Sequence, residues 1–212
     1  MANNTLNEQP QTRWWILVLV AMIVATVAVP AGVMAYRDRA AVKIMKMGGE
    51  IDVSDAPRGA DLMTMGGDID VKRVNGFAKA KTMGGNISIR QANAAVDAMT
   101  MAGNIDVQIV GSSSDHRDIE LSSNQGNITL TVPKDFPMQV HISVATTNNQ
   151  SKAFHIIDNI GLTQHADDSW DRSHGTPRKY LRATGHYGSG QNDVSISTIN
   201  GDVILQQGAQ QE

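Results

Sequence analysis

The sequence contains no cysteine in its 212 residues. This absence excludes disulfides, thiolate nucleophiles and cysteine-type zinc sites, but it does not decide the cellular compartment. Aromatic residues are few, with three each of Trp, Tyr and Phe, so the apolar core must consist of Val, Ile, Leu, Ala and Met. A basic excess is missing too, because the net charge is −3, and nothing indicates nucleic acid as a partner.

Motifs that hold catalytic groups are also absent. The sequence has no Gly-x-Ser-x-Gly elbow, no His-Glu-x-x-His pair and no Walker loop. The Gly-Gly pairs that do occur separate alternating runs, and none precedes a helical pattern, so they do not indicate phosphate binding. We therefore expect a protein that is not an enzyme and that needs no cofactor.

The first 35 residues differ from the rest of the chain. Residues 1–13 form a polar leader, and residues 14–35 run without a charge. A helix of that length spans about 30 Å of hydrocarbon, and Trp14, Trp15 and Tyr36 suit the interfacial aromatic belts of a membrane. The pattern predicts a transmembrane helix over 14–35, and a signal peptide cleaved after Ala35 is the open alternative.

Two features bear on the orientation of this segment. The basic residues that follow it (Arg37, Arg39, Lys43 and Lys46) favour a cytoplasmic position for what comes next. A soluble β domain behind a first apolar segment is nevertheless commonly exported. We therefore predict a single-pass protein of the cell membrane, with its β domain on the extracytoplasmic side, in the periplasm or at the cell surface.

A repeat follows the apolar segment. The pattern Met-Gly/Ala-Gly-x-Ile begins at Met47, Met65, Met83 and Met101, so its period is 18 residues without a gap. Looser copies occur further along the chain. The glycines that define all the copies are Gly49, Gly67, Gly85, Gly103, Gly126 and Gly201. Internal periods of this kind are typical of repeat architectures.

Each unit holds two short runs of alternating apolar and polar residues, which predict strands, separated by two turns. The fold class that follows is all-β: a single-stranded β-solenoid-like repeat domain of 18-residue coils over residues 42–206, behind one N-terminal transmembrane helix. Equivalent residues, such as Ile51, Ile69 and Ile87, would then stack in columns about 4.8 Å apart. An antiparallel meander or sandwich is the alternative. Residues 145–190 are irregular and residues 207–212 form a polar tail.

The repeats are similar to those of a known family. The Gly-Asp/Asn-Ile-x-Val units, the step Leu130-Thr131-Val132-Pro133 and the closing Gly188-Ser189-Gly190 with the run over 194–203 resemble the bacterial putative-adhesin family of repetitive β-solenoid-like proteins. The likeness covers roughly residues 42–206. It implies a β-solenoid-like fold at the cell envelope and no catalytic residues.

Methionines are the chemical feature that stands out. Their spacing of two within each pair places both thioethers of a pair on one face of a strand, and that face is outside or at a corner. Three hypotheses stay open: cover for apolar surface, an interaction stripe for a partner or for self-association, and a soft-metal Cu(I) site. The residues of this stripe are Met45, Met47, Met63, Met65, Met83, Met99 and Met101.

Carboxylates and histidines provide two further candidates. Acidic turn residues such as Glu50, Asp68 and Asp202 could suit calcium, but Asp and Asn also favour turns for local reasons, and we prefer that interpretation. His165, Asp168 and His174, in an otherwise irregular stretch, are candidate metal ligands or hydrolase residues.

The function predicted from the sequence is a membrane-anchored, non-catalytic structural or interaction module of the cell envelope. Its partners would be the membrane, through the N-terminal helix, and a protein, a glycan or another copy of itself. The alternatives are a periplasmic Cu(I)-binding protein that uses the methionines and a hydrolase that uses segment 165–174.

Overall fold

A computed structural model describes residues 40–111, 116–173 and 175–208. The chain divides into two compact units, Met1–Ala40 and Ala41–Glu212, and the architecture below is that of the second unit. Its described residues form 14 strands and no helix. The fold is therefore all-β, as the alternating runs predict.

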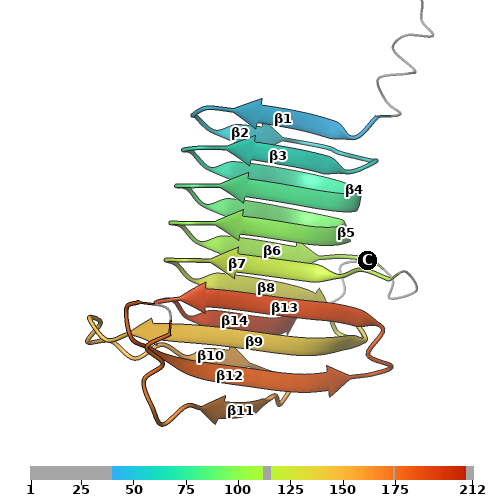
Figure 1. Ribbon diagram of the computed structural model, residues 1–212. Helices are drawn as coiled ribbons and strands as arrows, with labels where there is room; N and C mark the ends of the chain where they lie inside the picture. Colours follow the sequence, from blue (N-terminus) through green and yellow to red (C-terminus); the bar gives the residue numbers. More distant parts are fainter. Residues whose placement is uncertain (1–39, 112–115, 174, 209–212) are drawn as a thin grey trace, which may run out of the picture. The chain divides into compact units, whose positions relative to one another are not determined.

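All the strands belong to one continuous sheet, which curls like a half-barrel so that two walls face each other (Figure 1). The first wall consists of β2 (Ile51–Val53), β6 (Ile105–Ile109), β8 (Ile128–Pro133), β14 (Val203–Gly208), β10 (Ile156–Asp158) and the first halves of β4 (Ile69–Thr82) and β5 (Ile87–Thr100). The second wall consists of the second halves of β4 and β5 with β1 (Val42–Lys46), β3 (Ala60–Thr64), β7 (Ile119–Ser123), β13 (Asn192–Ile199), β9 (Met138–Thr147), β12 (Arg178–Tyr187) and β11 (Thr163–Ala166).

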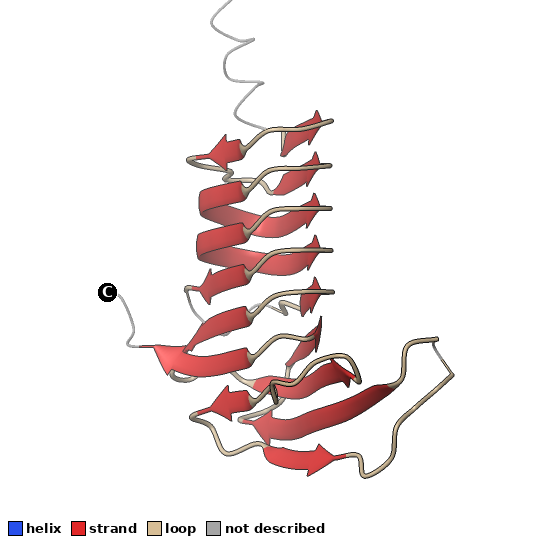
Figure 2. Cartoon of the chain, turned by 90° about the vertical axis from the view of Figure 1, so that its left-hand side faces the viewer, coloured by secondary structure: helices blue, strands red, loops and turns tan. Residues whose placement is uncertain are grey.

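The two walls are joined on one side by the long strands β4 and β5, which bend round from the first wall to the second (Figure 2). Their parallel register runs from Ile69 opposite Ile87 to Thr82 opposite Thr100. Each strand therefore contributes to both walls, and this bend holds the walls at a fixed separation.

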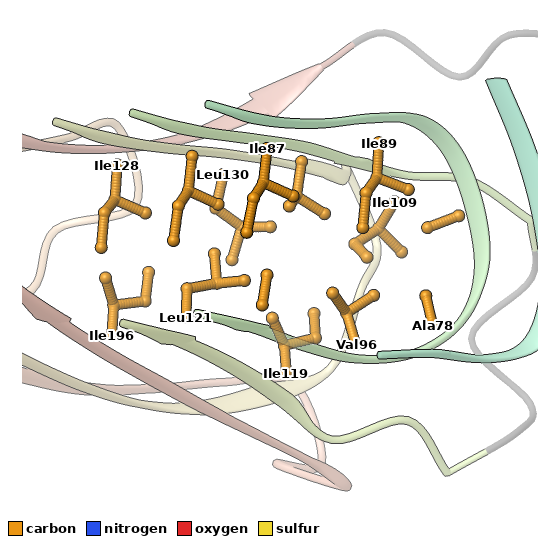
Figure 3. Packing of buried hydrophobic residues seen from close by; sticks show 14 of the residues in the cluster. Ala78, Ile87, Ile89, Val96, Ile109, Ile119, Leu121, Ile128, Leu130 and Ile196 are labelled. Carbon is orange, nitrogen blue, oxygen red and sulfur yellow. The ribbon is translucent and has the colours of Figure 1, made fainter. Parts of the chain in front are cut away.

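The core fills the space between the walls. Inward side chains from the first wall, such as Ile87 and Leu130, point towards those from the second, such as Leu121 and Ile196 (Figure 3). Parallel pairing stacks equivalent residues from one strand to the next, as the 18-residue spacing predicts for the first four members and the looser copy at Gly126 for the fifth. One such column is Ile51, Ile69, Ile87, Ile105, Ile128, Val203 and Ile156. Burying each isoleucine contributes about 1.5–3 kcal/mol.

On the other side the walls meet at a row of tight turns, here called the glycine corner, whose residues are 47–50, 65–68, 83–86, 101–104, 124–127 and 200–202. Successive turns approach very closely. A Cβ added to Gly85 would lie 2.5 Å from the carbonyl carbon of Gly67, and a Cβ added to Gly103 would lie 2.5 Å from that of Gly85. Only glycine fits at these positions, because the backbone of the preceding turn occupies the space that a side chain needs.

The predicted fold class is wrong as a description of the whole domain. A single-stranded solenoid of uniform 18-residue coils was expected, but the structure is one curled sheet with parallel and antiparallel strands. The interval between equivalent residues widens from 18 to 23 and then to 75 along the chain. The residues within the longest interval build β9, β10, β11 and β12, and β12 pairs antiparallel with both β9 and β11.

The prediction of a single-pass membrane protein with an extracytoplasmic β domain is also corrected. In the part of the chain that the structure describes, no helix is long and apolar enough to cross a membrane, because this part is built from strands. The predicted transmembrane helix over 14–35 itself lies outside the described residues. We therefore withdraw that localisation and the membrane as a partner.

The glycine corner makes a matched pair of variants available. Gly85→Ala should lower the free energy of unfolding by about 2–4 kcal/mol, because the methyl group would overlap the backbone of the preceding turn. Gly84→Ala should change it by less than about 1 kcal/mol, since no atom lies within 4 Å of the added Cβ and Ala102 already occupies the equivalent position. Urea unfolding measures both values. Equal midpoints for the two variants would contradict this account of the corner.

Candidate functional site

The methionine stripe consists of the seven predicted residues Met45, Met47, Met63, Met65, Met83, Met99 and Met101, and it lies on the outer side of the second wall and the glycine corner. Within β1, β3 and β5, Met45 pairs with Met63, and Met99 lies one strand beyond Lys81 in the same row. The other four begin successive turns of the corner. Exposed fractions run from 38% for Met63 to 86% for Met47. The structure therefore brings together all seven residues on one exposed surface.

This concentration of methionine is specific to the stripe. Of the 11 methionines in the sequence, three lie outside the described residues, and only Met138 among the others is buried in the core. The core is built from Ile, Leu, Val and Ala instead. Exposed thioethers in such a continuous set are unusual, because a folded domain ordinarily leaves large apolar side chains exposed singly.

Buried hydroxyl groups hold the methionines outward. Thr64, Thr82 and Thr100 precede Met65, Met83 and Met101 and point into the core, where the Thr100 hydroxyl donates to the Gly85 carbonyl at 2.9 Å. Equivalent hydrogen bonds are donated by Thr64 to Gly49, Thr82 to Gly67, Ser123 to Gly103 and Thr198 to Gly126. This role was not predicted from the sequence, although a Thr or Ser stands three residues before the corner glycine in every copy except the first, which has Lys46 there.

Charged side chains flank the stripe in one row across the second wall, here called the charge ladder: Lys43, Asp61, Lys79 and Asp97, on β1, β3, β4 and β5. Lys43 lies 3.5 Å from Asp61, and Asp97 lies 3.8 Å from Lys79 and 3.3 Å from Lys81. The charge thus alternates in sign over these four strands, and the alternation ends at Glu120 on β7, which lies opposite Asp97. The pairs are exposed, so each contributes little to stability, but together they leave the flank of the stripe nearly neutral.

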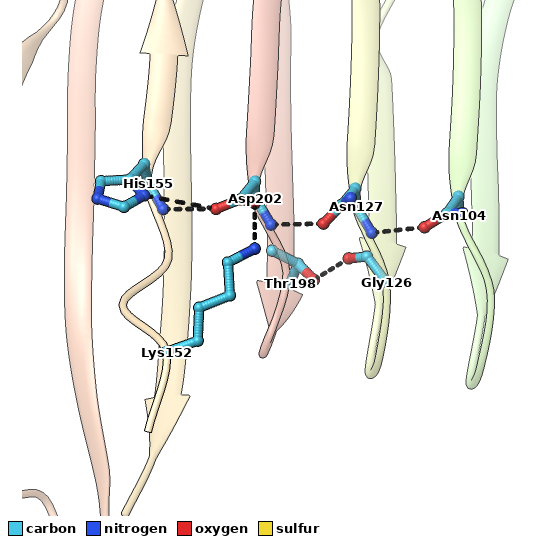
Figure 4. A network of polar contacts seen from close by, with 7 residues as sticks. All are labelled: Asn104, Gly126, Asn127, Lys152, His155, Thr198 and Asp202. Atoms are coloured by element: carbon cyan, nitrogen blue, oxygen red, sulfur yellow. Dashed lines mark hydrogen bonds and ion pairs between the residues drawn. The ribbon is translucent and has the colours of Figure 1, made fainter. Parts of the chain in front are cut away.

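The opposite flank of the corner carries a hydrogen-bonded row, here called the Asx ladder: Asp68, Asn86, Asn104, Asn127 and Asp202. Figure 4 shows its last three members. The Oδ1 atom of each accepts the backbone N–H of the next at 2.7–2.9 Å. Asp202 in turn accepts the His155 N–H at 2.9 Å, and its other oxygen pairs with Lys152 at 3.1 Å. These oxygens stabilise the turns, as turn chemistry predicts.

Asp202, at the end of this ladder, has an altered acidity. Burial by itself raises the pKa of its carboxyl, but the His155 N–H and the Lys152 ammonium outweigh burial and hold the pKa below the ordinary 3.8. The pKa of Asp158 is lowered in a similar way. Burial alone would raise it, but the N–H groups of Leu162 and Gly161 donate to the carboxylate and outweigh the effect of burial. Both carboxylates therefore serve as hydrogen-bond acceptors that shape the loops around β10.

The predicted His/Asp candidates lie in the region of β11 and β12. His165 is exposed on β11 opposite Arg182, and Asp168 is exposed in the bend that follows. Neighbouring Asp167 pairs with Arg182 at 2.6 Å. Within the described ranges no three His, Cys, Asp or Glu side chains converge as metal ligands, and His174 lies outside those ranges. The three-residue site therefore stays a prediction.

One shallow depression, with a volume of about 270 Å³, lies on the second wall beside the exposed ring of Phe77. Its lining is Phe77, Ala78, Lys79, Ala95, Val96, Asp97, Asp118 and Glu120. Lys79 and Asp97 in this lining already pair with each other. The lining has no serine, threonine or histidine, so it lacks the nucleophile and base that hydrolysis by a triad needs.

Asp202→Asn should make the stability less dependent on pH. The carboxylate contributes stability above the pKa of the unfolded chain, and this contribution is lost as pH falls through the lower folded pKa. At pH 7 the variant should be less stable by at most about 1 kcal/mol, and the difference should shrink as pH falls below the ordinary carboxyl pKa of 3.8 and through the lower folded pKa. Urea unfolding at pH 7, 4 and 2.5 tests this, with exposed Asp168→Asn as control. A difference that persists unchanged at pH 2.5 would disprove it.

Comparisons with known proteins add little to this description. No protein-family model matches the chain, and no curated protein matches it either. Among solved structures, the chain is similar to the crystal structure of a putative cell adhesion protein from Clostridium sporogenes, with 10% identity and a TM-score of 0.38. The similarity covers 79% of this chain and 94% of that chain. This likeness is too low to assign a family or a function, so the functional argument rests on the surface of the chain itself.

Proposed function

We propose that this chain is a non-catalytic binding module whose methionine stripe docks a protein partner with an apolar surface of low charge. The observation that carries the proposal is the exposure of seven methionines on adjacent strands and turns. A continuous apolar surface on a soluble domain is typical of an interaction site, because leaving it in water is unfavourable.

The side-chain type supports a docking role. Methionine is unbranched and polarisable, so one set of methionines can adapt its shape to different apolar surfaces. The backbone beneath is rigid by contrast, because the glycine corner and the buried threonine hydroxyls fix each turn. The stripe therefore combines a firm support with adaptable side chains, as in a surface that binds partners by packing.

The charges beside the stripe indicate what kind of partner it would bind. Lys43, Asp61, Lys79 and Asp97 neutralise one another along the charge ladder. A strongly charged partner would gain little from this flank. An apolar partner, in contrast, could cover the charge ladder without removing an unpaired charge of the ladder from water. Binding should therefore depend weakly on ionic strength.

A peptide selection tests the docking role. Random 12-residue peptides displayed on phage are panned against the full chain, and the selected peptides should be apolar with little net charge. The test variant replaces Met47, Met65, Met83 and Met101 with Gln, and it should bind these peptides at least about 10-fold more weakly because the apolar area is lost.

The matched control replaces the same four residues with Leu, which keeps the apolar area, so its affinity should stay within about 3-fold of the original. Peptides that bind the Gln variant as tightly as the original chain would overturn the proposal. A selection that yields no peptide above background would also count against it.

A second candidate function is soft-metal binding, and one observation favours it: the four equivalent turn positions all carry a thioether, and none carries Leu, Ile or Val. These thioethers, on Met47, Met65, Met83 and Met101, begin successive turns that are about 4.8 Å apart. Thioethers are ligands that suit Cu(I).

The Leu variant separates the two functions. Cu(I) is titrated against the full chain in competition with a chromophoric chelator, and a metal site should bind Cu(I) at micromolar concentration or tighter. Replacing the four methionines with Leu should abolish Cu(I) binding, since the soft ligand is lost, while peptide docking persists. Binding to the original chain that is weaker than micromolar would end the metal hypothesis.

A further inference from the structure

We infer that the methionine stripe binds the same stripe on a second copy of this chain, with the order of the strands reversed across a two-fold axis. This inference rests on the proposed function, in that the stripe must be a docking surface. The inference adds the identity of the partner, which follows from the alternation of charge beside the stripe.

The stripe and the charge ladder lie on four neighbouring strands of the second wall, in the order β1, β3, β4 and β5. A two-fold axis parallel to these strands, passing between β3 and β4, keeps each row of side chains facing the same row of the second copy. It reverses the strand order, so that β1 faces β5 and β3 faces β4. Such a self-complementary contact is what a closed dimer requires.

Methionines meet methionines in this arrangement. Met47 faces Met101 of the second copy, and Met65 faces Met83. In the neighbouring row Met45 faces Met99. The remaining position sets Met63 against Lys81, whose ammonium stays with Asp97 at 3.3 Å in its own chain. The aliphatic stem of Lys81 is then free to pack on the thioether.

The charge ladder becomes complementary under the same reversal. Lys43 of one copy faces Asp97 of the other, and Asp61 faces Lys79, so all four contacts across the axis join opposite charges. A two-fold axis perpendicular to the strands would keep the strand order but reverse the rows, so that the charge ladder would face either itself, with each charge opposite its own kind, or a different row, and both are unfavourable. The sign alternation along four strands therefore selects the reversed arrangement. A partner that lacked this pattern would not use the flank.

The size of the surface sets the strength of the contact. Four strands about 4.8 Å apart span about 15 Å, so the buried area is a few hundred Å² per copy, below the roughly 800 Å² per partner of a standard stable interface. The dimer should therefore be weak, with a dissociation constant on the order of 10 µM to 1 mM.

Charge-swapped variants test this geometry by sedimentation velocity of the full chain between about 10 µM and 1 mM. Lys43→Glu alone and Asp97→Lys alone should each weaken the dimer at least about 10-fold, because each places like charges across the axis twice. An equimolar mixture of the two variants should restore dimerisation to the original level, since Glu then faces Lys at one contact and Asp faces Lys at the other.

The mixture is its own control for folding, because neither chain changes on mixing. Lys72→Glu, which carries the same charge change on β4 but in the first wall, should leave the dimer unaffected. A mixture that is no more dimeric than its components, or an original chain that stays monomeric at 1 mM, would overturn the inference.

Disulfide trapping gives an independent readout, because the sequence has no cysteine of its own. Met47→Cys mixed with Met101→Cys should form a cross-linked dimer under mild oxidation, while either variant alone should form much less, since position 47 does not face itself. Equal cross-linking in all three samples would contradict the reversed order. If these tests fail while selected peptides still lose affinity for the Gln variant, the docking function stands and only the second copy as partner falls.

Discussion

The close approach of successive turns at the glycine corner is the constraint on which the rest of this domain depends. Gly67, Gly85, Gly103 and Gly126 each lie where a side chain would enter the backbone of the preceding turn. Because these turns stack without a gap, the strands on either side keep a parallel register, and isoleucine lies on isoleucine through the first wall. Relaxing the corner would therefore shift the core and the outer surface together.

The same constraint explains why the stripe is methionine outside and threonine inside. A turn held this closely leaves glycine carbonyls at the edge of the core, and the hydroxyls of Thr82 and Thr100 satisfy two of them. Threonine at the inward position forces the next residue outward, since side chains alternate along a strand. The exposure of Met83 and Met101 is thus a consequence of corner geometry. The geometry does not require these exposed residues to be methionine, and a binding role would explain that choice.

Much of the repeat region could be predicted, and the reasons for the failures are physical. The gap-free spacing predicted that Ile51, Ile69 and Ile87 stack, because equal intervals return the chain to the same place in each turn. The motif at Gly201 marked a last copy of the repeat, but the spacing could not predict that Val203 pairs directly with Ile128, since 75 residues that build other strands lie between equivalent positions. The antiparallel strand β12 has no clean alternation of burial, so period-2 analysis left its region irregular. For the candidate surface, the seven methionines were found from spacing alone, whereas the hydrogen bonds of the Asx and threonine rows needed coordinates.

Alternation of charge along the second wall has a simple origin within one chain. Repeated units place equivalent residues directly opposite one another, and like charges in that position are destabilising. Such like-charged pairs do occur elsewhere, as where Asp52 lies opposite Asp70 in the first wall and Asp97 lies opposite Glu120 on β7. The four strands that carry the stripe avoid them, because the sign changes from Lys43 to Asp61 and from Lys79 to Asp97. Reversing any such row with an even number of members sets every charge against its opposite. A constraint on stacking inside the chain thereby creates a surface that is complementary to itself, and the apolar stripe beside it supplies the favourable contact that the charges alone would lack.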